Sequence, residues 1–162
     1  MTLTPPLDTP DRRWPAGSDN RHRQREEASG SPHRESVTLP AEPRSAGTAR
    51  RLTERLCAAA ALDGTVSDAA VLLVSEVVTN AITHGGRGAR LTVTTGKLGV
   101  HVEVGDDNQD MPYWREPNMM AEDGRGIGIV DALATHWGIR AKPLGKVVWF
   151  QIVPVAKEVG SP

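Results

Sequence analysis

The sequence predicts an α+β fold in which helices cover one face of a mainly antiparallel sheet. Three observations predict this fold class. Apolar residues recur at helical spacing in three segments, apolar and polar residues alternate in shorter segments, and turn-forming glycines separate neighbouring strands. The chain of 162 residues is long enough for one compact domain with its own hydrophobic core. We therefore expect a two-layer sandwich.

Composition narrows the function classes. A net charge of −1 gives no electrostatic reason to expect direct binding to nucleic acid or to a membrane. The single Cys57 excludes an internal disulfide and a cysteine-based zinc site, and its alanine-rich surroundings favour a small buried residue over a nucleophile. No apolar run is expected to reach the roughly 18 residues that a membrane-spanning helix needs. The N-terminus has no signal-peptide hydrophobic region, so we expect a cytoplasmic protein.

The chain divides by composition into three parts. Residues 1–36 are rich in Pro, Arg, Ser, Glu and Asp and nearly lack aliphatic residues, which predicts a disordered tail. Its arginines suggest contact with RNA or an acidic partner as an alternative, but neighbouring glutamates favour a solvated tail. The folded domain is expected over residues 37–155, starting with a short strand at Val37–Leu39, and residues 156–162 form a C-terminal tail.

The first helix is expected from Arg44 to Ala60. Its buried stripe is predicted to contain Ala49, Leu52, Leu56 and Ala59. Gly64 is suited to cap the C-terminal end of this helix. Thr65 and Asp68 have the spacing of a capping box, so the next helix should begin near Val66.

This second helix is the most informative stretch of the chain. It should end at the glycine cluster Gly85, Gly86 and Gly88. One side of it carries an apolar stripe of Val71, Val74, Val78, Ala81 and Ile82. The opposite side carries Glu76, Asn80 and Thr83, flanked by Leu72 and Leu73. A helix that is apolar nearly all round is normally buried, and buried polar groups need partners. Two interpretations stay open at this point: a polar pocket, or a core helix whose polar groups bond to neighbouring backbone.

A hairpin follows, and its second strand ends at an aspartate. Leu91–Thr94 and Val100–Val104 alternate in polarity, and Gly96–Gly99 connects them. Asp106 has the parity of the buried valines, so its side chain should point toward the core at the open end of the strand. A carboxylate there can accept a hydrogen bond from an amino group such as that of adenine. The alternative is a turn aspartate among Asp107, Asn108 and Asp110.

The last third of the chain begins with a polar, irregular loop over Asp107–Asp123, of the kind that is usually functional or mobile. A third helix is expected from Gly126 to Trp137, with Gly138 as its cap. Its apolar face would comprise Ile127, Val130, Ala134 and Trp137. A final hairpin should pair Gly138–Ala141 with Val147–Val153.

The start of the third helix carries a cluster of glycines at Gly124, Gly126 and Gly128. Glycines allow close approach of the backbone to a ligand, and the free amides at a helix N-terminus suit phosphate. The spacing fits neither a Rossmann fingerprint nor a Walker A loop. A flexible helix start explains the cluster equally well.

Taken in order, these features resemble the GHKL ATPase superfamily of gyrase, Hsp90, histidine kinases and MutL. Ser75–Ala81 resembles its N box, Val104–Asp106 its first glycine box, and Gly124–Ile129 its second. Within the superfamily, the wording SEVVTNAITHG, GRGIGIVDALATHWG and GKVVWF is most similar to bacterial anti-sigma-factor serine/threonine kinases and their actinobacterial relatives. The resemblance covers residues 37–153.

The resemblance implies a Bergerat-type ATP site. Asn80 would coordinate Mg²⁺, and Glu76, one turn earlier, would be the general base for a seryl or threonyl hydroxyl or for water. Asp106 would bind the amino group of adenine, with Met111 against the ring. The phosphates would be held by the backbone of Gly124, Arg125, Gly126, Ile127 and Gly128, with added charge from the Arg125 side chain.

Some residues stand outside the pattern. His84 lies near the same helix face and is expected to be a supporting or surface residue, and Lys146 is expected to be an ordinary hairpin residue. The first glycine box has Asp107–Asp110 where glycines are usual. A valine, Val147 or Val148, replaces a common threonine of the last strand, which would remove one adenine-side hydrogen bond worth about 1 kcal/mol.

The resemblance implies an ATP-dependent serine/threonine protein kinase that sequesters a sigma factor or phosphorylates an anti-sigma antagonist protein. The resembling kinases are commonly dimers, so a homodimer is one expectation. The altered first glycine box motivates an alternative, a non-catalytic binding module with a degenerate nucleotide pocket. A histidine kinase catalytic domain is disfavoured, because His22 and His33 lie in the predicted tail and no helical dimerisation segment carries a phosphoacceptor histidine.

Overall fold

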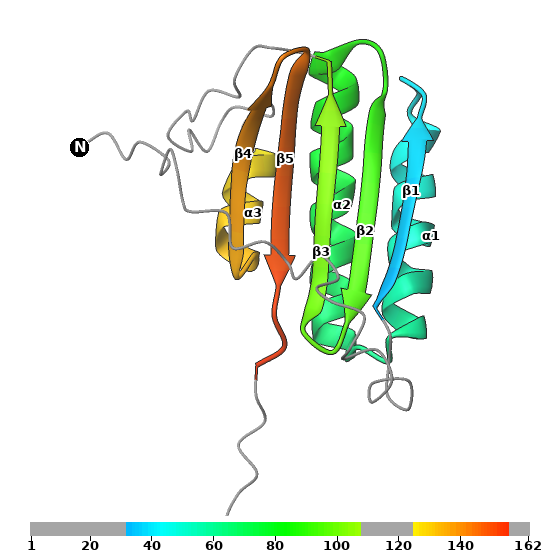
Figure 1. The fold of residues 1–162 in the computed structure, drawn as a ribbon, viewed down its shortest axis with the longest axis vertical. Coiled ribbons are helices and arrows are strands. Elements are labelled where there is room, and N and C mark those ends of the chain that lie inside the picture. Colours follow the sequence, from blue (N-terminus) through cyan, green and yellow to red (C-terminus); the bar gives the residue numbers. More distant parts are fainter. Residues whose placement is uncertain (1–31, 108–124, 156–162) are drawn as a thin grey trace, which may run out of the picture.

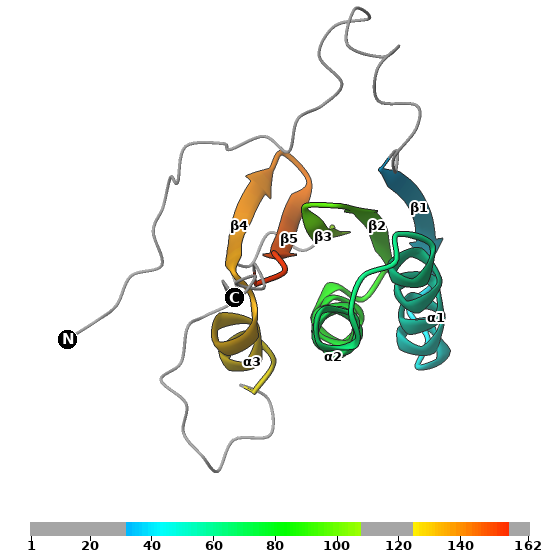
Figure 2. The ribbon, with the colours of Figure 1, turned by 90° about the horizontal axis from the view of Figure 1, so that it is seen from below.

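The computed structural model describes residues 32–107 and 128–155 in full, and the backbone of residues 125–127. A five-stranded sheet has the order β1-β2-β3-β5-β4, and all neighbouring strands are antiparallel. The elements are β1 (His33–Leu39), α1 (Arg44–Ala59), α2 (Gly64–Gly85), β2 (Ala89–Gly96), β3 (Gly99–Asp106), α3 (Arg125–Leu133), β4 (His136–Lys142) and β5 (Gly145–Ile152). The helices all lie on one face of the sheet (Figures 1 and 2). The predicted α+β two-layer sandwich is confirmed.

Strand β1 begins at His33, so the expected boundary between residues 36 and 37 is wrong, and His33 does not belong to a disordered tail. The strand pairs with β2 from His33 opposite Thr95 to Leu39 opposite Ala89. It is an edge strand with exposed side chains, and the Glu35 carboxylate accepts hydrogen bonds from Arg55 of α1 at 2.9 Å. An edge strand held by backbone pairing needs few aliphatic residues, which is why composition missed it. Residues 1–31 and 156–162, the rest of the expected tails, lie outside the described residues.

Helix α1 has nearly its predicted bounds, but its buried face is rotated. Buried positions on α1 are Ser45, Ala49, Leu52, Thr53, Leu56 and Cys57. Ala59, predicted to be buried, is exposed, because the face turned toward the core passes through Thr53 and Cys57 instead. Cys57 is fully buried as expected, and burial raises the pKa of its thiol, so it is unsuited to nucleophilic chemistry.

Helix α2 begins earlier than its capping-box pattern predicts. The carboxylate of Asp63 accepts a hydrogen bond from the backbone N–H of Val66 at 3.1 Å, which makes Asp63 the N-cap. Gly64 is therefore the first residue of α2 and not a cap of α1, and the left-handed residue between the helices is Ala61. The predicted C-terminal end is confirmed, because Gly86 has a φ of 70° and caps the helix.

Helix α2 is the central core helix. It contacts α1, α3, β2, β3 and β5. Its buried residues are Val66, Ala70, Leu73, Val74, Val77, Val78 and Ala81. Val71 and Ile82 are only half-buried, and Leu72 is 43% exposed. The prediction that this helix is buried nearly all round is therefore wrong. The apolar stripe is thus shifted toward Leu73 and Val77, and one side of the helix reaches solvent.

The composition of α2 also corrects the membrane expectation. The helix is long and apolar enough to cross a membrane by length and composition, with a mean hydropathy of 1.4 over the relevant window. A core helix of a soluble protein passes the same test. Its packing against the sheet and both neighbouring helices explains this apolar character without a membrane.

The predicted hairpin of β2 and β3 is confirmed, whereas α3 is shorter than expected. It ends at Leu133, and both Trp137 and Gly138 belong to β4. A Cβ on Gly138 would come within 2.9 Å of the Trp149 indole of β5, so the glycine makes room for this tryptophan. Trp137 fits the helical spacing of the apolar residues before it, but it belongs to β4 and packs against the core from there. Its fit to the helical pattern is a coincidence.

Candidate functional site

Asp106 lies at the end of β3 with its side chain on the helix-facing side of the sheet. It shares this side with the buried Val102 and Val104, and only 2% of its side chain is exposed. The predicted orientation is therefore correct. In the antiparallel register Asp106 lies opposite Lys146 of β5, and the Lys146 Nζ donates a hydrogen bond to the Asp106 Oδ1 at 3.0 Å. The carboxylate forms a buried ion pair.

Lys146 is a site residue that the sequence analysis missed. It is not an ordinary hairpin residue, because only 7% of its side chain is exposed and its ammonium group contacts a buried carboxylate. The signal was present, since Lys146 has the same parity in its strand as Val148 and Phe150, which face the core. A lysine at such a position needs an acidic partner.

Two glycines allow the backbone to close around this ion pair. Gly85, the last residue of α2, lies so close that an added Cβ would come within 3.3 Å of the Asp106 Cβ. Gly145, at the start of β5, has a φ of 119°, and a Cβ there would collide with the carbonyl oxygen of Asp106. The end of α2 and the turn between β4 and β5 are thus held against Asp106 without an intervening side chain.

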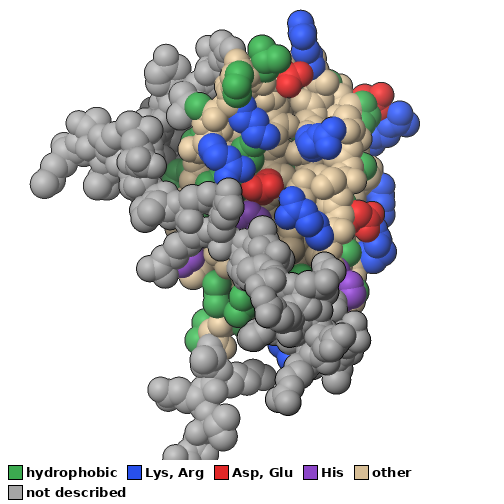
Figure 3. Space-filling view, viewed as in Figure 1, with side chains coloured by type: hydrophobic (Ala, Val, Ile, Leu, Met, Phe, Trp, Pro, Cys, Tyr) green, Lys and Arg blue, Asp and Glu red, His purple; other side chains and the backbone are tan. Residues whose placement is uncertain are grey.

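Asp106 and Lys146 also line a cavity of about 250 Å³ at this end of the sheet. Other residues that line it include Arg87, Arg90, Asp107 and Lys142. Figure 3 shows Lys and Arg side chains gathered on the sheet face of the molecule. The ion pair is therefore bordered by a hollow with a positively charged rim, and not only by the core.

Glu76 and Asn80 lie one turn apart on α2, so they share a face of the helix. Both residues are half-buried, which corrects the expectation that they are buried groups in need of protein partners. The physical reason is the partial exposure of this side of α2, where Leu72 also reaches solvent. Water can reach the polar oxygens of Glu76 and Asn80, so these oxygens do not need a protein partner to offset a loss of hydration. They remain suited to a ligand that approaches from solvent.

Helix α3 begins at Arg125 and lies beside α2 in the helix layer (Figure 2). Its first turn supplies the backbone amides that the sequence assigns to phosphate. At Gly128 an added Cβ would meet no atom of the described residues within 4 Å, so this position has room for a ligand as far as those residues are concerned. Met111 and Gly124, like the side chains of residues 125–127, lie outside what the structure describes.

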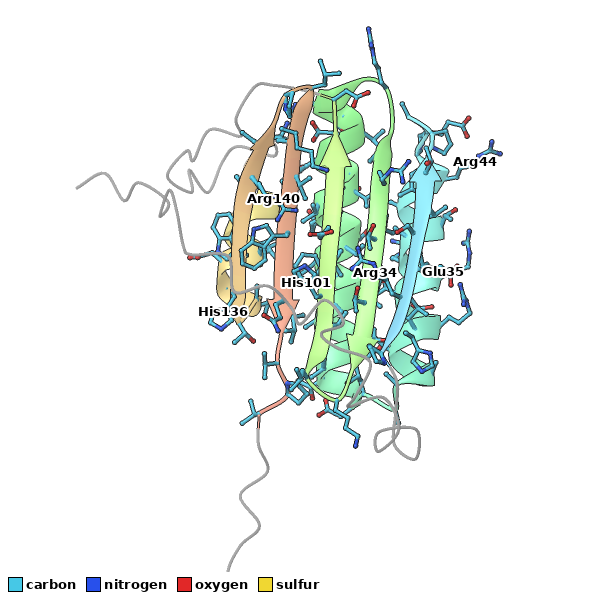
Figure 4. The ribbon with its side chains drawn as sticks, viewed as in Figure 1. Arg34, Glu35, Arg44, His101, His136 and Arg140 are labelled. Atoms are coloured by element: carbon cyan, nitrogen blue, oxygen red, sulfur yellow. The ribbon has the colours of Figure 1, made fainter. Side chains whose placement is uncertain are left out.

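A separate polar cluster lies on the sheet face that no described helix covers. The Glu103 carboxylate accepts a hydrogen bond from Arg140 at 3.0 Å and lies 3.7 Å from the His101 Nε2. The His101 ring stacks on Trp149, with centroids 5.8 Å apart. Figure 4 shows His101 and Arg140 on this face. The interaction with His101, supported by Arg140, lowers the pKa of Glu103 to about 2.

This pKa predicts how acid affects the fold. Because the folded-state pKa of Glu103 lies below its ordinary value of 4.5, the cluster stabilises the protein above about pH 4.5, and this contribution is lost as the pH falls toward 2. We expect Glu103→Gln to lower the free energy of unfolding at pH 6 by about 1–2 kcal/mol and to flatten its decline in acid. Urea unfolding at a series of pH values measures both effects. Glu35→Gln, in an exposed pair with Arg55, is the control; equal acid sensitivity of Glu103→Gln and wild type would contradict the assignment.

Comparison with known protein families identifies the family of this domain. The family model described as "Histidine kinase-like ATPase domain" matches residues 39–152. The chain belongs to this family. Its membership confirms the resemblance stated from the N box and the two glycine boxes, and it implies that the protein binds ATP. The match spans the fold from the end of β1 to the end of β5, so it includes α2, Asp106 and α3.

One solved structure of a similar protein supports the same fold, and a second is reported beside it. The RsbU and RsbW domains of Rv1364c from Mycobacterium tuberculosis align with a TM-score of 0.57 and 21% identity, covering 73% of this chain and 31% of that one. The chain thus spans about a third of that protein's length. The histidine kinase domain of the blue-light-activated EL346 from Erythrobacter litoralis gives a TM-score of 0.45 and 21% identity, covering 70% of this chain and 61% of that one. Comparison with curated protein sequences finds no significant match.

Proposed function

We propose that this histidine kinase-like ATPase domain is an ATP-dependent serine/threonine protein kinase of the anti-sigma type. The observation that carries the proposal is the combination of Glu76 and Asn80, one turn apart on the half-exposed side of α2, with the buried Asp106 carboxylate of β3, which lies against the C-terminal end of the same helix. It would act in the cytoplasm on an anti-sigma antagonist protein or a sigma factor. It would regulate transcription through these protein contacts, without binding nucleic acid itself, as a monomer or a homodimer.

The described residues fit the nucleotide that the family implies. Asp106 supplies a carboxylate that can accept a hydrogen bond from an amino group, and the first turn of α3 supplies amides for phosphate oxygens. Asn80 supplies a carboxamide oxygen of the kind that Mg²⁺ accepts as a ligand. In this proposal Met111 lies against the adenine ring, and the backbone from Gly124 to Gly128 surrounds the phosphates.

Bound Mg–ATP supplies the phosphoryl group and neutralises part of its charge. The residues of the chain then have separate roles. Glu76 accepts the proton of the attacking seryl or threonyl hydroxyl, so that its oxygen forms the new bond to phosphorus as the bond to the leaving diphosphate oxygen breaks. Asn80, one helical turn away from this base, would hold the metal ion that offsets the phosphate charge. Asp106 fixes the base of the nucleotide, which sets the position of the phosphates relative to Glu76.

A second candidate function is a non-catalytic binding module of the same fold. Two observations favour it. Lys146 already forms a hydrogen bond with Asp106, and the acidic run that starts at Asp107 stands where the resembling kinases carry glycines. In such a module, the pocket would stabilise a shape that binds a partner protein and would transfer no phosphate.

The experiment that separates these functions is a calorimetric titration of ATP, with and without Mg²⁺, into the full chain and into Asn80→Ala. The kinase proposal predicts that wild type binds ATP in a Mg²⁺-dependent manner and that Asn80→Ala weakens binding about tenfold or more. Thr79→Ala, an exposed neighbour on the same helix, is the control and should bind like wild type. Absence of binding to wild type at millimolar ATP would overturn the kinase proposal and favour the binding module.

A further inference from the structure

The pairing of Asp106 with Lys146 raises the question of what the lysine does for a nucleotide site. The two side chains lie in register across β3 and β5, and the helix end at Gly85 closes on the carboxylate from the other layer. A carboxylate buried to this degree is stable in its charged form only with a cation or several donors beside it. Lys146 provides such a cation.

The hydrogen-bonding capacity of the Asp106 carboxylate in this ion pair decides which bases it can recognise. An ionised carboxylate only accepts hydrogen bonds, whereas a protonated one also donates. A group that only accepts hydrogen bonds binds a nucleotide base that carries an amino group, and it forms no hydrogen bond with a nucleotide base that lacks one. Loss of the Lys146 ammonium group would remove the partner that fixes the orientation of this acceptor. Lys146 thus bears on nucleotide recognition without needing to touch the nucleotide.

We infer that Lys146 is the positioning residue for base recognition: its ammonium group, paired with Asp106 at 3.0 Å, holds the carboxylate oriented so that Asp106 accepts a hydrogen bond from the exocyclic amino group of an adenine nucleotide. The inference rests on the proposed nucleotide site. It adds a residue that the sequence analysis assigned to an ordinary hairpin, and it states the ligand class as purine nucleotides that carry this amino group.

The test compares two ligands that differ only in the amino group. The amino-group preference is the Kd of purine riboside 5′-triphosphate divided by the Kd of ATP, both measured with Mg²⁺ by calorimetry on the full chain. We expect a preference of roughly tenfold or more in wild type, since the hydrogen bond is made to a charged acceptor. In Lys146→Met the preference should fall to about one, through weaker ATP binding and little change for purine riboside triphosphate.

Matched variants complete the test. Lys142→Met removes an exposed cation that lines the same cavity, and it should keep the wild-type preference. Lys146→Arg keeps the cation and should restore the preference lost in Lys146→Met. If Lys146→Met does not fold, Lys146→Gln takes its place, because its amide still donates a hydrogen bond but carries no charge.

Each outcome separates this inference from the function on which it rests. If wild type binds neither triphosphate, the nucleotide site itself is wrong. If wild type prefers ATP and the folded uncharged variant keeps that preference, the nucleotide site stands and the role of Lys146 is refuted. An increased preference in the uncharged variant would also refute the inference, because it would mean that Lys146 competes with the adenine for Asp106.

Discussion

Glu76→Gln should reduce phosphoryl transfer to a cognate antagonist protein by a factor of about 10²–10⁴ while leaving ATP affinity within about twofold. Glutamine has the shape of glutamate and keeps α2 intact, but its amide cannot accept the proton of the attacking hydroxyl. Glu76 is half-buried on the accessible side of the helix, so the substitution leaves no buried charge without a partner. Transfer of radiolabelled phosphate measures the first quantity, and calorimetry measures the second.

The matched control is Glu54→Gln on α1, an exposed glutamate in the neighbouring helix, which should transfer phosphate at the wild-type rate. A Glu76→Gln variant that transfers phosphate within threefold of wild type would show that another group accepts the proton. If the variant lost both ATP binding and phosphoryl transfer, Glu76 would instead contribute to holding the nucleotide.

Asp106→Ala should lower the free energy of unfolding by about 3–5 kcal/mol, because it leaves the Lys146 ammonium group buried without its carboxylate. Replacing both residues at once, as Asp106→Leu with Lys146→Met, should restore most of this loss, since apolar side chains of similar size remove both buried charges. Chemical denaturation in the absence of nucleotide measures these effects.

Glu35→Ala serves as the control for the buried pair, because its partnership with Arg55 is exposed and should contribute less than about 1 kcal/mol. A loss below about 1 kcal/mol for Asp106→Ala would mean that Lys146 finds water or another acceptor at little cost. The double replacement would then show no rescue.

The central elements of the fold were predictable because their signals are local. Helix α2 and the β2–β3 hairpin have long periodic patterns that end at glycines, and the structure contains both, although α2 begins at Gly64 and its buried face is shifted. The errors lie where a partner in space overrides the local pattern. His33 is held in a strand by pairing with β2, and Trp137 occupies a core position from β4 even though its spacing continues a helical face.

The candidate site shows the same division. Strand parity was sufficient to orient Asp106, and it would have oriented Lys146 if it had been applied to the last strand as well. The cluster around Glu103 could not be foreseen, because His101 and Arg140 reach it only through the position of β4 relative to β5 and of β5 relative to β3. Such contacts depend on the sheet order, which no local motif of this sequence specifies.

The strand order has a further consequence for how the chain can be divided. All strand pairs among β1, β2 and β3 belong to the first part of the chain, and the pair of β4 and β5 belongs to the last. In the described sheet the two parts meet along the single seam of β3 with β5, and Asp106 and Lys146 form its last rung. If the chain were divided between residues 108 and 124, each of the two polypeptides would retain its own strand pairs. The topology therefore suits fragment complementation, and the Asp106–Lys146 ion pair would help to hold the two fragments together.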